Sequence, residues 1–253
     1  MSEIKMIVTD LDGTLLREDK TISERSLHAI MSCRAKGIKV IFATGRGGSA
    51  DAFAPIELFD GYIFMNGAIA YIGDKLIYSK LMQIEKVRDL LVAANDAGIN
   101  TSVERNGIHY ANFNVTKKWP WIPYYEETDF RKLDIEVEKA SAIAETPEVR
   151  ELVTKYMPDG AYAVFSRDDL AMVMHKDAVK SKAVAAMAEY WNIRRHEIVA
   201  FGDDINDSDM LRYCGIGVAM ENALDEVKTA ADCICESNDN DGFAKWIEEN
   251  VLA

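Results

Sequence analysis

The sequence is poor in cysteine, in positive charge and in long apolar runs, and each shortage excludes a class of protein. The four cysteines, Cys33, Cys214, Cys233 and Cys235, show no zinc-ligand spacing, which favours thiols in a reducing compartment. No apolar run approaches the roughly 18 residues of a membrane span. The first residues, Met-Ser-Glu-Ile-Lys-Met, lack a signal-peptide core. We therefore expect a cytoplasmic protein.

The shortage of positive charge excludes two kinds of partner. Lysine and arginine number 29 against 42 aspartates and glutamates, a net charge of −13. Such a chain has no electrostatic footprint for nucleic acid or for an anionic membrane, so we expect neither as a partner. Small phosphorylated molecules are not excluded, because a local cation or a metal held by carboxylates can reverse the charge at a site. The oligomeric state stays open.

The overall composition is that of a globular protein. Hydrophobic residues make up 49% and charged residues 28% of the 253 positions, which excludes disordered, collagen-like and coiled-coil classes. A chain of this length can bury a sizeable core and form one large domain or two modest ones.

Both ends of the chain alternate short apolar runs with helix-period stretches. Strands are expected at 4–9, 38–43, 62–65, 198–201, 216–219 and 232–235. Helices are expected at 24–36, 181–191, 206–213, 222–230 and 241–252. Strands that are apolar on both faces and alternate with helices predict an α/β fold with a doubly wound, Rossmann-like parallel sheet.

The middle of the chain has a different pattern. A helix is expected at 84–97 and another from Thr146-Pro147, with strands at 100–104, 108–113, 133–138, 161–165 and 170–174. Adjacent strands with tight connections indicate antiparallel pairing and hence an inserted α+β domain. The predicted organisation is a core of 1–81 and 178–253 that is interrupted by a cap at 82–177.

Polar residues gather where several of the predicted core strands end. Asp10-Leu11-Asp12-Gly13-Thr14 follows the first strand, and Thr44-Gly45-Arg46 follows the second. Residues 203–207 (DDIND) follow the strand at 198–201, and Ser181-Lys182 begins the helix before it. Ligands of open α/β sheets bind beyond the carboxyl ends of the strands. Independent surface turns would not be expected to collect there, so the pattern predicts one site.

Taken together, these motifs resemble the haloacid dehalogenase-like phosphohydrolases, in particular their Cof-type sugar-phosphatase branch with a subclass IIB-like cap. The resemblance covers the whole chain. It is carried by DLDGTLL, ATGR, NGA, the Ser-Lys pair, GDxxND and GVAMxNAxxxVKxxAD, which stand in the family's order.

The resemblance implies a role for each aspartate of the site. Asp10 would be the nucleophile that forms an aspartyl phosphate. Asp12 would be the general acid to the leaving group and then the general base to water. Mg2+ would be held by the Asp10 carboxylate, the Asp12 backbone carbonyl and Asp203, a donor set that suits magnesium. Asp207 would orient the lysine or metal-bound water.

The resemblance also implies the phosphate contacts. Lys182 and the Thr44 hydroxyl would hold the phosphoryl oxygens, and the backbone N–H groups of Leu11 and Gly45 would add donors. Asn206 would lie near the phosphate. Lys176 and Lys180 are nearby alternatives for the lysine, but Lys182 follows Ser181 at the expected helix start and fits the motif better.

The expected function is therefore a cytoplasmic, Mg2+-dependent phosphatase that acts on a small phosphorylated metabolite, with sugar phosphates as the leading class. Flavin mononucleotide and pyridoxal phosphate are alternatives, because the aromatic segment 117–125 (KKWPWIPYY) could stack on a flat ring. A phosphosugar mutase of the same superfamily is a further alternative, and a non-catalytic metabolite-binding module is disfavoured because no catalytic aspartate is missing. Asn66-Gly67-Ala68 is equally consistent with a structural turn and a substrate contact.

Overall fold

The computed structural model describes residues 3–122, 124–165 and 169–253. The chain divides into two compact units. We call residues 1–46, 50–79 and 179–253 the core unit, and residues 80–178 with 47–49 the inserted unit. The pattern of the sequence had put the corresponding boundaries at 82 and 177.

The core unit is built on an eight-stranded sheet. Its strand order is β16-β15-β14-β1-β2-β3-β4-β5, parallel from β16 to β3 and antiparallel over the β3-β4-β5 meander. The strands are β1 Met6–Thr9, β2 Lys39–Ala43, β3 Gly61–Phe64, β4 Ile69–Ile72, β5 Lys75–Ser79, β14 Ile198–Gly202, β15 Ile216–Ala219 and β16 Cys233–Ile234. The central strands β1 and β14 are buried along their whole length.

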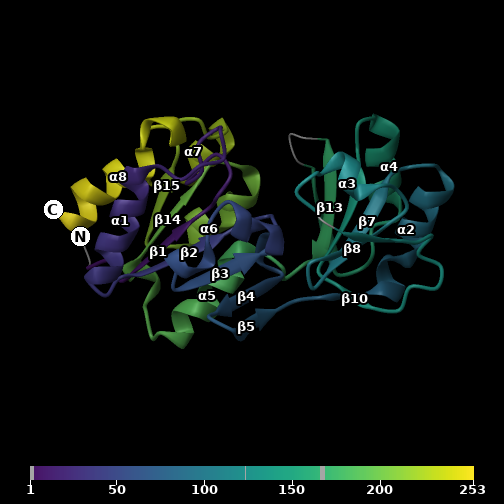
Figure 1. Ribbon diagram of the computed structural model, residues 1–253, viewed down its shortest axis with the longest axis horizontal. Coiled ribbons are helices and arrows are strands. Elements are labelled where there is room, and N and C mark those ends of the chain that lie inside the picture. Colours follow the sequence, from purple (N-terminus) through teal and green to yellow (C-terminus); the bar gives the residue numbers. More distant parts are fainter. Residues whose placement is uncertain (1–2, 123, 166–168) are drawn as a thin grey trace. The chain divides into compact units, whose positions relative to one another are not determined.

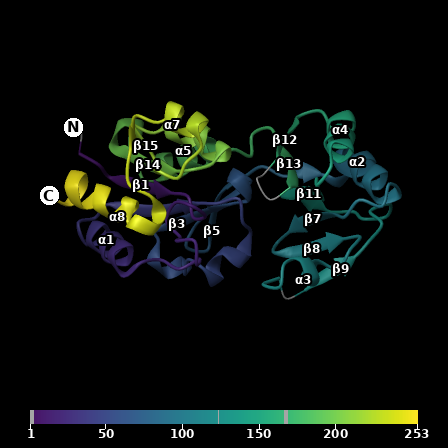
Figure 2. The same ribbon diagram turned by 90° about the horizontal axis from the view of Figure 1, so that it is seen from above.

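Helices cover both faces of this sheet (Figure 1). Helices α1 (Glu24–Ala35) and α8 (Gly242–Ile247) lie together on one face. Helices α5 (Lys180–Tyr190), α6 (Ser208–Tyr213) and α7 (Asp225–Ala230) lie on the other, where Figure 2 labels α5 and α7. This three-layer arrangement confirms the predicted α/β fold class with a parallel-sheet core.

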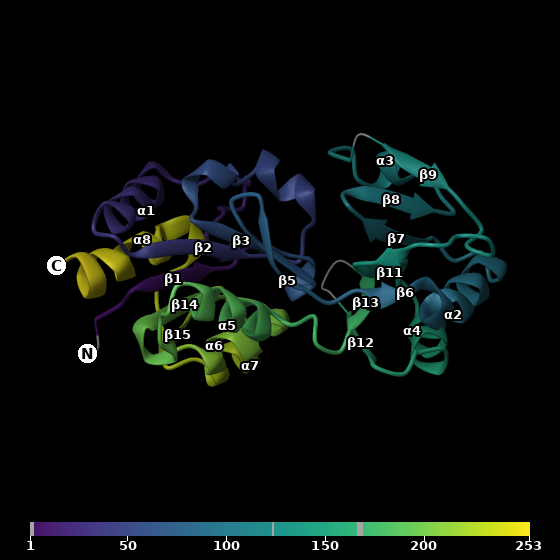
Figure 3. The same ribbon diagram turned by 90° about the horizontal axis from the view of Figure 1, so that it is seen from below.

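The inserted unit has its own sheet and its own core. The strand order is β12-β13-β11-β7-β8-β9, and a separate pair joins β6 to β10. These strands are β6 Met82–Gln83, β7 Thr101–Arg105, β8 Ile108–Ala111, β9 Tyr125–Glu127, β10 Glu136–Val137, β11 Lys139–Ile143, β12 Ala161–Phe165 and β13 Leu170–His175. Helices α2 (Ile84–Asp96) and α4 (Pro147–Lys155) pack on one face, and the short α3 (Val115–Lys118) lies on the other (Figure 3).

One predicted strand of this unit was wrong in position. The alternating segment 133–138 contributes Leu133, Ile135 and Val137 to the core, but only Glu136 and Val137 pair, with β6. The central strand is instead β11, which pairs with both β7 and β13. Its sequence, KASAI, combines small residues with a buried lysine, so it lacks the strong apolar alternation that marks a strand.

No helix in the described part of the chain is long and apolar enough to cross a membrane.

Candidate active site

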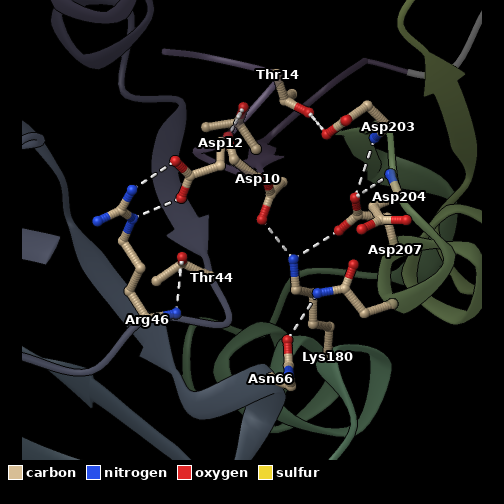
Figure 4. Close-up of polar contacts among 12 residues, drawn as sticks. Asp10, Asp12, Thr14, Thr44, Arg46, Asn66, Lys180, Asp203, Asp204 and Asp207 are labelled. Carbon is tan, nitrogen blue, oxygen red and sulfur yellow. Dashed lines mark hydrogen bonds and ion pairs between the residues drawn. The ribbon is translucent and has the colours of Figure 1, made fainter. Parts of the chain in front are cut away.

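Four connections of the core unit meet at the carboxyl ends of the parallel strands. Asp10 follows β1, Thr44 follows β2 and Asp203 follows β14, while Lys180 is the first residue of α5. Figure 4 shows these side chains turned toward one another. The geometry follows from the topology, because parallel neighbours such as β1, β2 and β14 end at the same edge of the sheet.

Lys180 is the centre of the cluster. Its Nζ donates to Asp10 Oδ1 and to Asp207 Oδ1, both at 2.6 Å. The lysine and Asp207 are fully buried, and Asp10 is 6% exposed. A buried ammonium persists only where carboxylates compensate its charge. Lys180 can therefore be buried because Asp10 and Asp207 compensate its charge.

The charge of this cluster is unbalanced toward the negative. Burial raises the pKa of Asp10 well above its ordinary value, repulsion from Asp207 and Asp203 adds to this, and Lys180 opposes it. Burial, with repulsion from Asp207, raises the pKa of Asp203 to about 7. Burial alone would lower the pKa of Lys180, but Asp10 and Asp207 raise it, so this lysine stays charged. One ammonium thus faces three buried carboxylates.

Asp203 is held by the loop that carries Asp10 and Asp12. The Thr14 hydroxyl donates to Asp203 Oδ1 at 2.9 Å. Gly13 has φ +80, and a Cβ at this position would overlap the Asp203 carboxylate. Glycine is required here for two reasons, the left-handed backbone and the close approach of the carboxylate.

Asp207 fixes the chain that leaves β14. Its Oδ2 accepts from the backbone N–H of Asp203 at 3.0 Å and of Asp204 at 3.1 Å, while its Oδ1 accepts from Lys180. A carboxylate that bridges two loops in this way sets the distance between them. Asp207 was predicted to orient Lys182 or metal-bound water; the lysine that it contacts is Lys180.

Asp12 lies at the edge of the cluster and faces two other cations. Arg46 contacts both of its carboxylate oxygens, Nε to Oδ2 at 2.5 Å and a terminal nitrogen to Oδ1 at 2.6 Å, and Lys20 Nζ lies 3.0 Å from Oδ1. Burial by itself would raise the pKa of Asp12, but Arg46 and Lys20 together lower it. The Arg46 guanidinium also stacks on Phe53, with 4.3 Å to the ring centroid.

The other predicted phosphate contacts line the same edge. Thr44 is buried, and its hydroxyl accepts from the Arg46 N–H at 3.1 Å. Leu11 and Gly45 immediately follow Asp10 and Thr44, as the motifs require. Asn206 donates from Nδ2 to Asn66 Oδ1 at 2.7 Å.

The position predicted for Lys182 is corrected by the structure. Lys182 is exposed, and Lys180 occupies the place beside Asp10. Helix α5 begins at Lys180, one residue earlier than expected, and the Ser181 N–H bonds the Asp209 carboxylate. The buried stripe of this helix gives the signal that was missed. Ala183, Val184 and Met187 lie three, four and seven residues after Lys180 and so share its face.

The three buried carboxylates could hold a metal ion. One oxygen each from Asp10, Asp203 and Asp207 lie within 4.8 Å of one another. The Asp12 carboxylate is not in this group of described residues, so a metal contact from Asp12 would have to use its backbone carbonyl. Carboxylate oxygens are the ligands that hard cations such as Mg2+ prefer.

A family comparison agrees with this geometry. Residues 7–247 match the family model of haloacid dehalogenase-like hydrolases. The chain belongs to the haloacid dehalogenase-like hydrolases. A Haemophilus influenzae relative is 32% identical over 269 residues, which cover 97% of each chain. The 5-amino-6-(5-phospho-D-ribitylamino)uracil phosphatase YitU of Bacillus subtilis is 28% identical over 265 residues, 96% of each chain.

Solved structures place the chain among the phosphatases of this haloacid dehalogenase-like family. The subclass IIB sugar phosphatase BT4131 superposes with a TM-score of 0.88 at 26% identity, over 98% of this chain and 100% of that one. The phosphatase BT1666 of Bacteroides thetaiotaomicron gives 0.84 at 26% identity, over 98% and 95%. The resemblance inferred from the motifs is thus confirmed, and the protein is a phosphatase of the haloacid dehalogenase-like family.

Proposed function

We propose that the protein is a Mg2+-dependent phosphatase that hydrolyses a small phosphorylated metabolite through a phosphoryl group carried on Asp10. The observation that carries the proposal is the buried contact of Lys180 with Asp10 and Asp207. An anionic carboxylate can approach an anionic phosphate only where positive charge is concentrated. Lys180 supplies such charge beside Asp10, at the strand ends where ligands of these sheets bind.

The donor set fits Mg2+. Asp10 and Asp203 would hold the ion with their carboxylates and Asp12 with its backbone carbonyl, while Asp207 supports the site through its bonds to Lys180 and to the Asp203 N–H. The raised pKa values of Asp10 and Asp203 report unbalanced negative charge, which a divalent cation would offset. When bound, Mg2+ supplies charge neutralisation between the nucleophile and the phosphate.

In the first chemical step, an Asp10 carboxylate oxygen attacks phosphorus and the bond from phosphorus to the leaving oxygen breaks. Lys180 and the Thr44 hydroxyl hold the phosphoryl oxygens while charge shifts between them. Asp12 carries the proton that the leaving oxygen takes up. To reach that oxygen in its protonated form, Asp12 must leave the bidentate contact with Arg46.

In the second step, water attacks the phosphorus of the Asp10 phosphoryl group and the carboxylate is released. Asp12 takes the proton of this water as a general base. The pair with Arg46 and Lys20 lowers the pKa of Asp12 and so favours its ionised form, which is the form that this step needs. The same side chain thus serves both steps in opposite protonation states.

For the substrate, sugar phosphates and sugar-alcohol phosphates are the proposed class, and the inserted unit is the proposed cap that selects among them. The support comes from neighbours, because BT4131 is described as a sugar phosphatase and YitU by its ribitylamino-uracil phosphate. A substrate with a flat ring is the second candidate, favoured by Trp121 and Tyr124, which are 48% and 58% exposed. Exposed aromatic faces of this kind can stack on a planar ring.

A screen for phosphate release tests the proposal. The purified chain is incubated with Mg2+ and a panel of sugar, polyol, flavin and pyridoxal phosphates, with Asp10→Asn as the inactive variant and Asp74→Asn, an exposed hairpin residue, as its matched control. We expect the wild type and Asp74→Asn to release phosphate from at least one member of the panel, and Asp10→Asn to release none. Absence of release across the panel, or release by Asp10→Asn, contradicts the proposal. A phosphate isomer that forms without release identifies a mutase instead.

A further inference from the structure

The turn that follows β3 has an uncommon backbone. Met65, Asn66 and Gly67 all have positive φ values, 51°, 54° and 101°. Met65 and Asn66 are 1% exposed, so the turn is not a surface feature. Consecutive non-glycine residues in the left-handed region persist only where the surrounding structure holds them, and such strain concentrates at functional sites.

The turn is bonded to the loop that carries Thr44. The Asn66 N–H donates to the Thr44 carbonyl and the Met65 N–H to the Arg46 carbonyl, both at 2.9 Å. Gly45 lies between these two anchors, and a Cβ there would come within 2.9 Å of Asn66 Oδ1. The left-handed backbone of Met65 and Asn66 directs both N–H groups toward this loop.

The side chain of Asn66 reaches a second loop. Its Oδ1 accepts from Asn206 Nδ2 at 2.7 Å (Figure 4). The opposite orientation of the Asn206 amide would set two carbonyl oxygens against each other. Asn206 Oδ1 is shielded from solvent and has no hydrogen-bond partner among the described residues. Asn66 Oδ1 therefore holds the Asn206 side chain through its amide nitrogen.

The third contact is with the start of α5. A Cβ on Gly67 would overlap the backbone carbonyl group of Val179, the residue that precedes Lys180. Helix α5 thus begins in van der Waals contact with the turn, and any larger residue at position 67 would displace it.

We propose that Asn66 is a positioning residue for phosphoryl transfer: its side chain holds Asn206, and the left-handed turn 65–67 in which it lies holds the Thr44 loop and the start of α5 at Lys180. The inference rests on the proposed function, and it gives Asn66 a role that needs no contact with the substrate. Preorganised donors stabilise a transition state only if their spacing is fixed before the reaction. The turn contacts all three of the loops that carry these donors.

The test separates the side chain of Asn66 from its backbone. Asn66→Gly keeps the left-handed turn and removes the side-chain amide. Asn192→Gly is the matched control, because Asn192 is an exposed asparagine that also has a left-handed φ (55°) and lies remote from the site. With Mg2+ and p-nitrophenyl phosphate we expect Asn66→Gly to lower kcat about tenfold, as for one well-made hydrogen bond. KM should stay within about twofold, because ground-state binding is retained. Orthovanadate, which imitates the transition state, should bind about tenfold more weakly.

Asn206→Ala provides an independent variant. It should lower kcat by a similar factor, and the double variant should be no worse than Asn206→Ala within about twofold, because both changes remove one contact. A kcat of Asn66→Gly within twofold of wild type, an equal loss in Asn192→Gly, or multiplying losses in the double variant overturns the positioning role. If the wild type releases no phosphate, the proposed function fails on that result, and vanadate binding still tests the positioning.

Discussion

Replacement of Lys180 by methionine removes the cation that bonds two buried carboxylates, Asp10 and Asp207. Asp10 and Asp207 each lose a 2.6 Å contact and stay buried. Removing one partner of a buried ion pair costs about 3–5 kcal/mol. For a protein of this size, that corresponds to a fall in Tm of about 6–20 °C. Turnover should fall by about 10²–10³, the usual cost of losing one transition-state donor.

The pH dependence of this defect has a definite sign. Without Lys180, the pKa values of Asp10 and Asp203 in the folded state lie even further above their values in the unfolded chain. A carboxylate with a raised folded pKa binds more protons when folded, so the folded state gains stability as pH falls. The destabilisation of Lys180→Met should therefore grow as pH rises through neutral and shrink in acid, because the folded-state pKa of Asp203 is already about 7 with Lys180 present.

Urea unfolding and p-nitrophenyl phosphate turnover measure the two effects. Lys182→Met is the matched control, because this lysine is exposed and lies two residues along the same helix. It should change stability by less than about 0.5 kcal/mol and turnover little. If Lys182→Met loses turnover while Lys180→Met keeps it, the assignment of the site lysine is refuted. A loss of stability in Lys180→Met that is independent of pH refutes the electrostatic reasoning.

The remaining predictions concern the same carboxylates. Without metal, the urea midpoint of the wild type should fall as pH rises from about 5 to 8, because the pKa of Asp203 is about 7 in the folded state and lies near 3.8 when unperturbed; a flat profile contradicts this. Mg2+ at about 100 times its Kd should stabilise the protein by about 2.7 kcal/mol near neutral pH. Asp203→Asn should raise the metal-free midpoint at high pH and abolish the gain from Mg2+, and a retained gain removes Asp203 from the metal site. Gly13→Ala should destabilise the protein by about 1–3 kcal/mol and weaken its stabilisation by Mg2+. Gly37→Ala, at φ +82 with open space around it, should show the backbone strain alone. Equal stabilisation of the two variants by Mg2+ contradicts the argument that Gly13 is needed for the close approach of Asp203.

Much of the core unit could be predicted from the sequence because each strand is a short apolar run that ends at a polar motif. Strand β1 ends at Thr9 and Asp10 follows it, so the pattern itself located the edge of the sheet where the site lies. Local pattern and tertiary structure agree in these segments. The same agreement made the α/β class predictable.

The site lysine and strand β11 could not be placed from local pattern, for related physical reasons. Lys180 and Lys139 are buried charged residues, and a sequence pattern treats lysine as a surface residue. Their burial depends on distant partners, Asp10 and Asp207 for the first and Glu104 for the second. The apolar stripe of α5 would have favoured Lys180, because Lys182 falls on the exposed face of that helix.

Asn66 illustrates what lies beyond any local signal. Its sequence neighbours indicate only a turn, and a structural turn and a substrate contact fit them equally well. The left-handed φ values and the bond to Asn206, 140 positions away in the chain, appear only in the folded structure.

The central claim is that phosphoryl transfer passes through Asp10, and an acid-quench experiment tests it most directly. The wild type is mixed with Mg2+ and a turned-over phosphate ester, quenched in acid during steady state, digested and analysed by peptide mass spectrometry. We predict one phosphoryl group on the peptide that contains Asp10, absent from Asp10→Asn and labile to hydroxylamine, as an acyl phosphate is. Turnover without any such adduct, or an adduct on another residue, contradicts the account.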